Sequence, residues 1–199
     1  MTESTSNAPA RRGVPLWAQI LIWVILLGLM IFLAGGLGLL SFLGWHTSQQ
    51  ASVQPGTKIP DFTMPLFSGY EMNGKSQMDI ADLSGKVVMI NFWASWCKPC
   101  EQEAADLRQA WDFYKGTGKV VFLGVDYVDT EPEARAYMEK FGITYANGPD
   151  LGTKVSQMFR IKGVPETYFL DQQGVLRHVQ VGPFTSLNDI KSVIDPMIH

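Results

Sequence analysis

Hydrophobic residues fall into one long block near the N-terminus and then into shorter runs separated by polar segments. The block, VPLWAQILIWVILLGLMIFLAGGLGLLSFLGW, extends from Val14 to Trp45 and contains no charged residue. A helix crosses the bilayer core with about 20 apolar residues, and this block is longer. Trp17 and Trp45 stand near its ends, where indole rings favour the membrane interface. The block predicts one N-terminal transmembrane helix at residues 14–45.

The same block is unlike a cleaved signal peptide, whose apolar region has about 7–15 residues and ends in a small-residue cleavage site. We therefore expect an uncleaved signal anchor. Arg11 and Arg12 precede the block, whereas Gly44 to Thr57 carries no Lys or Arg. The positive-inside rule then predicts a single-pass protein of the cell membrane, with a cytoplasmic N-terminus and an extracytoplasmic domain on the periplasmic side.

The polar segments divide the rest of the chain. Residues 1–13 form a short cytoplasmic tail, and residues 46–56, HTSQQASVQPG, are poor in aliphatic side chains and are typical of a linker. Residues 57–199 are long enough for one domain with its own core. The expected organisation is tail, anchor, linker and one globular domain.

Within that domain, strand and helix patterns alternate. Lys86–Trp93 and Lys119–Tyr127 are β-rich runs of the kind buried on both faces of a sheet, and Pro99–Tyr114 between them has apolar residues at helical spacing. This order predicts a βαβ unit with parallel strands and a right-handed crossover.

Four further features complete the predicted α/β domain. We expect helices within TEPEARAYMEKFGI, DLGTKVSQMFRI and TSLNDIKSVIDPMI, and a hairpin formed by ETYFLD and GVLRHVQVG. A net charge of -3 and a pI near 5.6 provide no basic surface, so no nucleic-acid binding is expected.

The candidate chemistry lies in NFWASWCKPCEQE, which contains both cysteines of the chain, Cys97 and Cys100. A structural disulfide there would close too small a loop to stabilise a domain with its own core. A zinc site needs four ligands, and no second cysteine pair completes one. A copper site of both cysteines with His178 remains open. A redox couple fits the placement best, with no metal and no cofactor.

The redox interpretation assigns different roles to the two cysteines. Cys97 ends a strand-to-helix turn, where amide groups and the helix dipole lower a thiol pKa below its free value of about 8.5. Cys97 is therefore the expected exposed nucleophile, and Cys100, one turn later, resolves the mixed disulfide. Pro99 stiffens the turn, and Lys98 adds positive charge near the thiolate.

FWASWCKPC, followed later in the chain by KGVPETYFLD, resembles the membrane-anchored thioredoxin-like proteins of the TlpA/ResA/DsbE (CcmG) group. The resemblance covers roughly Pro55 to Ile198, and GVPET with RHVQVGPFT narrows it toward the cytochrome c maturation branch. It implies a thioredoxin-like fold, in which a central mixed sheet is flanked by helices.

The resemblance also implies roles for particular residues. Pro165 matches the cis-proline beside the active-site cysteines, so Val164–Pro165 is predicted cis. Glu166 matches a glutamate of the DsbE-like branch, and Glu103 matches the acidic residue of the CxxCxxE pattern. Thioredoxin has a buried aspartate where this chain has Asn91. Because Asn cannot accept a proton, any carboxylate serving Cys100 must come from elsewhere, and Glu103 and Glu166 are the candidates.

Other positions near the motif are candidates for contact with a client protein: Trp96, Lys98, Pro99 and Val164. Trp93, in contrast, is expected to pack in the core. Many relatives place a proline soon after the CxxCxxE glutamate, whereas this chain continues with Ala104 and Ala105. We therefore expect a straighter helix here than in those relatives.

The predicted function is an extracytoplasmic thiol–disulfide oxidoreductase, working as a reductase. The resemblance implies apocytochrome c or its maturation proteins as disulfide clients, and a membrane electron donor of the CcdA/DsbD kind. A dithiol oxidase or isomerase shares every motif residue. A peroxiredoxin-like enzyme needs Thr or Ser where this chain has Ala94. A non-enzymatic copper chaperone and a pure interaction module are candidates from other classes of protein.

Overall fold

The computed structural model describes residues 15–42 and 53–198, and the chain divides into two compact units, Met1–Gln49 and Gln50–His199. Each unit is described by itself. The predicted cytoplasmic tail, both arginines before the anchor, Trp45 and most of the predicted linker lie outside the described residues.

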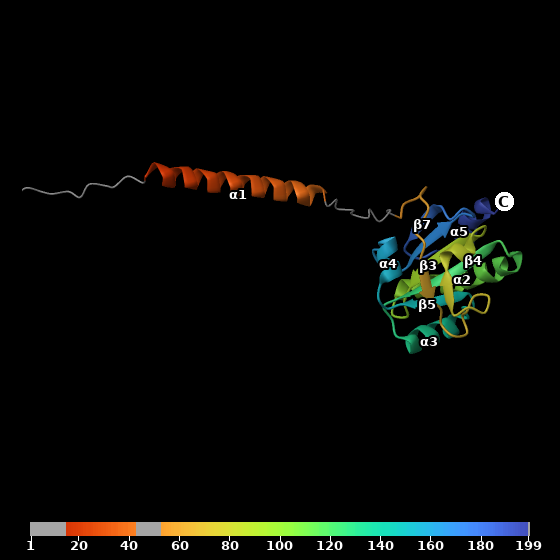
Figure 1. The fold of residues 1–199 in the computed structure, drawn as a ribbon. Coiled ribbons are helices and arrows are strands. Elements are labelled where there is room, and N and C mark those ends of the chain that lie inside the picture. The colour runs from red at the N-terminus through yellow and green to blue at the C-terminus, as the bar shows by residue number, and fades with distance from the viewer. Residues whose placement is uncertain (1–14, 43–52, 199) are drawn as a thin grey trace, which may run out of the picture. The chain divides into compact units, whose positions relative to one another are not determined.

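The first unit contains one helix, α1, Leu16–Phe42 (Figure 1). Its 27 residues correspond to a length of about 40 Å, more than the apolar thickness of a bilayer. Over Leu16–Leu33 the mean hydropathy is 2.5 and no residue is buried. The prediction of one N-terminal apolar helix long enough to cross a membrane is confirmed.

The second unit is built on a five-stranded sheet with the order β5-β4-β3-β6-β7 (Figure 1). β3, β4 and β5 are parallel, whereas β6 and β7 continue the sheet antiparallel. The five strands are Val87–Trp93, Val120–Tyr127, Ala146–Asp150, Glu166–Leu170 and Leu176–Val181. The predicted parallel pair and the predicted hairpin are both present.

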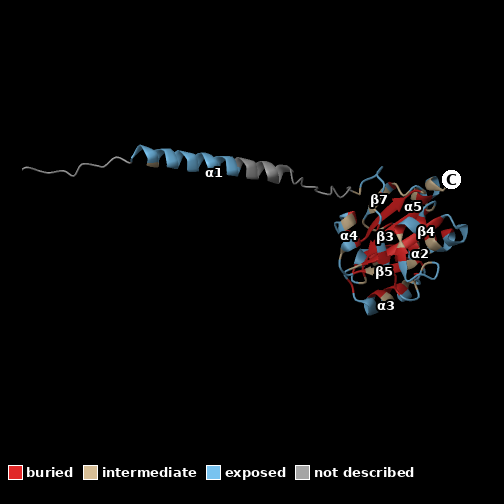
Figure 2. Cartoon of the chain, in the orientation of Figure 1, coloured by how far each residue is buried: buried red, intermediate tan, exposed pale blue. Residues whose placement is uncertain are grey.

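β3 occupies the centre of this sheet, and all seven of its residues are buried. The uninterrupted run VVMINFW supplies apolar side chains to both faces, as a strand covered on both sides requires. Figure 2 shows the same pattern, with the strands buried and the outer surfaces of the helices exposed.

Helices cover the two faces of the sheet unequally. α2, α3 and α5 supply Leu107, Met138 and Ile190 to one core cluster, so we call this side of the sheet the α2 face. α4 supplies Val155 to the other cluster, on what we call the α4 face. The four helices are Lys98–Tyr114, Glu131–Phe141, Lys154–Phe159 and Leu187–Ile194. The predicted thioredoxin-like α/β fold is confirmed.

Three short 3-10 turns, η1 to η3, complete the domain at Ile80–Leu83, Lys115–Thr117 and Asp195–Met197. A small hairpin of β1, Thr63–Pro65, and β2, Gln77–Asp79, precedes the βαβ unit. The sequence patterns predicted neither this hairpin nor β5.

β5 has the unfavourable strand sequence ANGPD, and Pro149 is tolerated because β5 lies at the sheet edge. A side chain at Gly148 would place its Cβ 1.9 Å from the carbonyl oxygen of Pro65, so only glycine allows this close approach of β1. Tertiary contacts, rather than β propensity, therefore specify the edge strand.

Candidate active site

The two cysteines lie where β3 leads into α2 and are joined by a disulfide with an S–S distance of 2.08 Å. Cys97 is the N-cap of α2, and its sulfur accepts the backbone N–H of Cys100 at 3.1 Å. The expectation that the helix begins directly after Cys97 is correct. In the reduced protein the same amide and the helix dipole would stabilise a thiolate on Cys97.

The expectation of an exposed Cys97 is wrong for this disulfide-bonded form. Cys97 is 4 % exposed and Cys100 is 1 % exposed. The loop before β6 covers the Cys97 sulfur, and the Val164 carbonyl oxygen lies 3.4 Å from it. In this form both cysteines are therefore enclosed by the surrounding residues and by this loop.

That covering loop contains the Val164–Pro165 peptide bond, which is cis as the resemblance implied. Pro165 is buried, and its carbonyl oxygen accepts the N–H of Gly182 at 3.0 Å. Val164 is half-buried beside the disulfide. The loop thus brings backbone groups next to Cys97, where an extended client segment can meet them.

Glu103 is the carboxylate that the structure brings to the cysteine side of the sheet. It is 1 % exposed and lies one turn after Cys100 on the buried side of α2. Its two oxygens accept the side-chain amide of Asn91 at 2.9 Å and the backbone N–H of Phe184 at 3.0 Å. Burial raises the pKa of Glu103 to about 7, although both donors act to lower it.

Asn91, which stands where thioredoxin has an aspartate, supplies no carboxylate itself but donates to Glu103 and orients it. Its amide nitrogen also donates to the Thr167 hydroxyl at 2.9 Å, so β3, α2 and β6 are joined by one buried network. A carboxyl group with a pKa near 7 can exchange a proton with a thiol in the neutral pH range.

Glu166 is equally buried, at 3 % exposure, but its side chain lies on the α4 face. Its oxygens accept the backbone N–H of Lys162 at 2.7 Å and the Tyr168 hydroxyl at 2.8 Å. Along β6, Thr167 points to the α2 face and Glu166 to the opposite face. The structure does not bring Glu166 to Cys100; it connects Glu166 to the loop that carries the cis-proline.

The other predicted site residues surround the disulfide. Trp96 is 56 % exposed, and its indole N–H donates to the Val128 carbonyl oxygen at 3.3 Å. Pro99 is exposed in the first turn of α2. The Lys98 ammonium lies 3.2 Å from the Glu101 carboxylate, so its charge is shared with an acid rather than directed at the sulfur alone. Trp93 is 2 % exposed and stacks on Tyr137, as expected for a core residue.

Two acids that the sequence patterns did not single out lie at the same edge of the sheet. Asp126 ends the buried part of β4 beside Trp93, and Asp129 accepts the backbone N–H of Ser95 at 2.7 Å. Their position after an apolar parallel strand was the available signal, because polar groups at the carboxyl ends of such strands commonly serve function.

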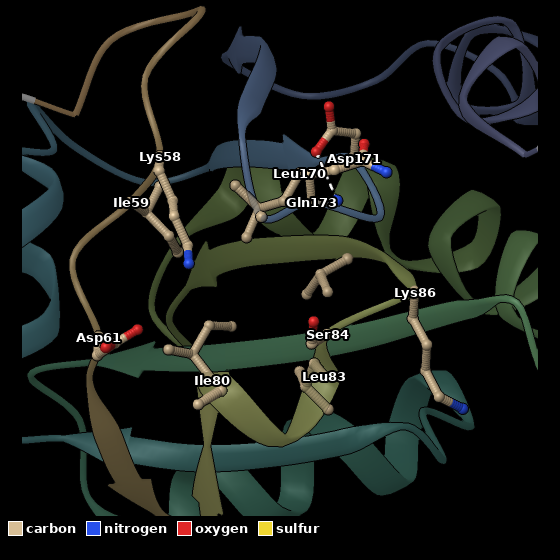
Figure 3. A pocket seen from close by; sticks show the side chains of 13 residues that line it. Lys58, Ile59, Asp61, Ile80, Leu83, Ser84, Lys86, Leu170, Asp171 and Gln173 are labelled. Carbon is tan, nitrogen blue, oxygen red and sulfur yellow. Dashed lines mark hydrogen bonds between the residues drawn. The ribbon is translucent and has the colours of Figure 1, made fainter.

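Two further observations concern metal sites and a cavity away from the cysteines. Within residues 15–42 and 53–198, no group of three or more His, Cys, Asp or Glu side chains could hold a metal ion. A cavity of about 240 Å³ lies elsewhere in the domain. Its apolar lining, which includes Ile80, Leu83 and Leu170 (Figure 3), belongs to the α4 face. No cysteine contributes to it.

Comparison with known proteins agrees with this geometry. A family model described as the AhpC/TSA family matches residues 55–179. The thiol:disulfide interchange protein DsbE of Allochromatium vinosum is 34 % identical over 160 residues, which are 79 % of this chain and 83 % of DsbE. The thiol-disulfide oxidoreductase ResA of Geobacillus kaustophilus is 27 % identical over 157 residues, which are 79 % of this chain and 86 % of ResA.

Among solved structures, a thiol:disulfide interchange protein of the thioredoxin family from Chlorobium tepidum superposes with a TM-score of 0.63 and 26 % identity. The match covers 75 % of this chain and 100 % of that chain. Family model, relatives and fold converge on the chemistry that the paired cysteines indicate. The chain therefore belongs to the AhpC/TSA family, as a thioredoxin-like thiol-disulfide oxidoreductase of the ResA and DsbE kind.

Proposed function

We propose that the protein is an extracytoplasmic reductase whose clients are disulfides of apocytochrome c or of its maturation proteins. The observation that carries this proposal is the Cys97–Cys100 disulfide at the start of α2, with the buried Glu103 one turn later. The resemblance of GVPET and RHVQVGPFT to the cytochrome c maturation branch supports the choice of client, and so does the likeness to DsbE.

The reaction transfers two electrons to the client in two exchanges. In the reduced protein, the Cys97 thiolate attacks one sulfur of the client disulfide, and the other client sulfur leaves as a thiolate. Cys100 then loses its proton and attacks the Cys97 sulfur, which releases the second client thiolate. The products are a client dithiol and the Cys97–Cys100 disulfide seen in this structure.

Glu103 is the proposed proton acceptor for Cys100. It lies on the buried side of α2 with Cys100, and its pKa of about 7 suits transfer at neutral pH. Glu166 takes a different proposed role. Through the Lys162 N–H it positions the loop of Val164 and Pro165, and so it acts on the client site indirectly.

Turnover requires that the disulfide be reduced again. We propose a membrane electron donor of the CcdA/DsbD kind, because a reductant in an oxidising compartment needs a supply of electrons. The proposed topology has a cytoplasmic tail at residues 1–13, an anchor at 14–45, a linker at 46–56 and the redox domain at 57–199. Arg11 and Arg12 before the anchor support a cytoplasmic N-terminus.

The reduction potential of the full chain, purified in detergent and equilibrated with dithiothreitol or glutathione buffers, tests the direction of electron flow. A potential near about -270 mV, the thioredoxin value, is expected for a reductase. A potential near about -120 mV would make the protein a disulfide donor and would overturn the proposed reductase.

A peroxiredoxin-like enzyme and a copper chaperone would each give a different result with the same preparation. The peroxiredoxin-like enzyme would consume hydrogen peroxide, whereas Ala94 stands where such an enzyme requires Thr or Ser. The copper chaperone would retain one Cu(I) per reduced chain and would not reduce the disulfides of insulin. Reduction of insulin without peroxide consumption is the expected outcome.

A further inference from the structure

Asp126 is a buried acid at the active-site end of β4. It is 1 % exposed and pairs in register with Trp93 of β3 on one side and with Pro149 of β5 on the other. No hydrogen-bond donor reaches either of its carboxylate oxygens. An ionised carboxylate without a donor is costly in such a place, and the group needs a compensating partner.

Burial raises the pKa of Asp126, and the acid that acts on it is Asp129, whose charge and side-chain hydrogen bond raise that pKa further. The Asp129 carboxylate is already occupied by two backbone amides, those of Ser95 at 2.7 Å and Thr130 at 2.8 Å. Both oxygens of Asp129 thus have backbone donors of their own, whereas neither oxygen of Asp126 has one. Burial and the neighbouring Asp129 raise the pKa of Asp126, so its protonated form is favoured and can donate to Asp129.

The backbone between the two acids supports this contact. Val128 has a φ of 48°, a left-handed conformation that β-branched residues rarely adopt. The chain therefore bends directly after β4, and beyond this bend the Asp129 carboxylate accepts the Ser95 N–H of the loop before α2. Strain of this kind is retained where the surrounding structure needs the resulting geometry.

The Asp129 carboxylate connects this pair of acids to the active-site loop through the Ser95 N–H. Ser95 lies two residues before Cys97, and the Cys97 N–H donates to the Ala94 carbonyl oxygen at 3.2 Å. Trp96 makes a second bond between the same two loops, through the Val128 carbonyl oxygen. The backbone before Cys97 is thus held by hydrogen bonds to the segment after β4, in addition to its chain connection to β3.

We propose that Asp126 is a positioning residue for thiol–disulfide exchange: it donates a hydrogen bond to Asp129, and this carboxyl–carboxylate pair holds the Ser95 amide and hence the Cys97 loop. The proposal rests on the thiol-disulfide chemistry of the family and is independent of which client or electron donor the protein uses. When Asp126 ionises, the two carboxylates repel, and the Ser95 amide loses its fixed acceptor.

The direction of the pH effect follows from the environment of Asp126. Burial and the Asp129 charge raise the pKa of Asp126 to about 8. The pair is therefore intact at pH 7 and opens as the pH rises through about 8.

Other titratable groups on the surrounding elements have partners of their own. Glu101 on α2 pairs with Lys98 and Lys140, and the Asp150 carboxylate after β5 accepts the amides of Val155 and Ser156. Glu103 on α2 accepts from Asn91 and Phe184, Glu131 on α3 pairs with Arg135, and Glu133 accepts the Thr130 hydroxyl. Tyr137 on α3 and the two cysteines lie on the same face of the sheet. Asp129 is the charge that acts on Asp126.

The experiment compares the full chain in detergent with Asp126→Asn, Asp126→Ala and the surface control Asp82→Asn between pH 6.5 and 9. Two quantities are measured: hydrogen exchange of the Ser95 amide, corrected for intrinsic base catalysis, and kcat/KM for insulin reduction with dithiothreitol. Expressing each rate relative to wild type removes the pH dependence that all the proteins share.

The Asn side chain can donate to Asp129 at every pH, whereas Ala cannot. We therefore expect Ser95 in the wild type to lose protection above pH about 8 and Asp126→Asn to keep it. The rate of Asp126→Asn relative to wild type should rise about fivefold from pH 7 to 9, the factor expected for one net hydrogen bond. Asp126→Ala should be slower at pH 7 by a similar factor, and Asp82→Asn should follow wild type.

An Asp126→Asn profile that matches wild type in both measurements would overturn the proposal. If Asp126→Ala does not fold, the comparison of wild type with Asp126→Asn still decides, because Asn conserves shape. A lost insulin activity in all proteins, with Ser95 protection behaving as expected, would count against the proposed reductase and leave the positioning role standing.

Discussion

Each face of the central sheet contains one buried glutamate, Glu103 on the α2 face and Glu166 on the α4 face. Both are nearly inaccessible, at 1 % and 3 % exposure, and each accepts two hydrogen bonds. They differ in surroundings. Glu103 shares its face with both cysteines, whereas Glu166 is enclosed with Tyr168 and the loop at Lys162.

The difference arises from strand alternation rather than from distance along the sequence. Glu166 follows the cis-proline directly, yet in β6 it is Thr167 that faces the α2 side and meets Asn91. Successive strand residues point to opposite faces, so a shift of one position would exchange the two side chains. Glu103 is therefore the carboxylate available to the cysteines, and Glu166 supports the loop beside them.

The largest effects should come from the cysteines of the α2 face. Cys97→Ser removes the attacking sulfur and is expected to reduce insulin turnover by about a thousandfold or more. Cys100→Ser leaves that sulfur in place but removes the group that resolves the intermediate. It should therefore accumulate mixed disulfides, visible as covalent adducts by mass spectrometry under non-reducing conditions.

Each variant is the control for the other, because neither can form the internal disulfide. Adducts that formed on Cys97→Ser and were absent from Cys100→Ser would reverse the assigned roles.

The next largest effect concerns the pH dependence of stability. The pKa of Glu103 is raised from 4.5 to about 7, so the folded protein binds more protons than the unfolded chain in this interval. The corresponding contribution is complete below pH about 4.5 and is lost as the pH rises through about 7, a change of about 3 kcal/mol. Glu103→Gln should abolish this part of the slope, as measured by urea denaturation of the oxidised protein from pH 4 to 8.

Glu166→Gln provides the matched control, since it changes a glutamate of similar burial on the other face. Equal slopes for Glu103→Gln and wild type would show that Glu103 does not hold a proton in the folded state. The proposed transfer from Cys100 would then need another acceptor.

A smaller effect is expected on the α4 face itself. Glu166→Gln leaves one of two donors, Lys162 N–H or the Tyr168 hydroxyl, without its carboxylate oxygen and should cost about 1–3 kcal/mol of stability. Tyr168→Phe removes one of these bonds from the other side and should cost a similar amount. Neither variant should alter the pH profile of insulin reduction, and a displaced profile in Glu166→Gln would restore this residue to the proton-transfer step.

Much of this comparison could be predicted from the sequence. The apolar run of β3, the helical spacing of α2 and the turn residues of the β6–β7 hairpin are local signals, and each predicted the element that forms. β5 was missed because ANGPD has no strand signal and is held by contacts with β4 and β1. Such contacts join residues distant in sequence, which local patterns do not report.

The site shows the same division between local and distant information. The resemblance to the CxxCxxE pattern indicated Glu103 together with Cys97 and Cys100, and all three lie at the start of α2, with Cys97 as its N-cap. The face that Glu166 occupies depends on strand register, and the proposed pairing of Asp126 with Asp129 depends on a turn with a left-handed valine. The exposure of Cys97 was overestimated because the covering loop comes from a part of the chain far from the motif.

The smallest expected effect tests where a client reaches the α2 face. Trp96 is 56 % exposed beside the disulfide, whereas Trp93, three residues earlier, is 2 % exposed and stacked on Tyr137. Trp96→Ala should therefore change stability by less than about 1 kcal/mol, while Trp93→Ala should cost about 3–5 kcal/mol. If the exposed indole contacts clients, Trp96→Ala should raise KM for insulin about fivefold and leave the rate with dithiothreitol, which is too small to need this contact, unchanged. Equal slowing with insulin and with dithiothreitol would instead mean that Trp96, through its bond to the Val128 carbonyl oxygen, shapes the Cys97 loop and does not bind the client.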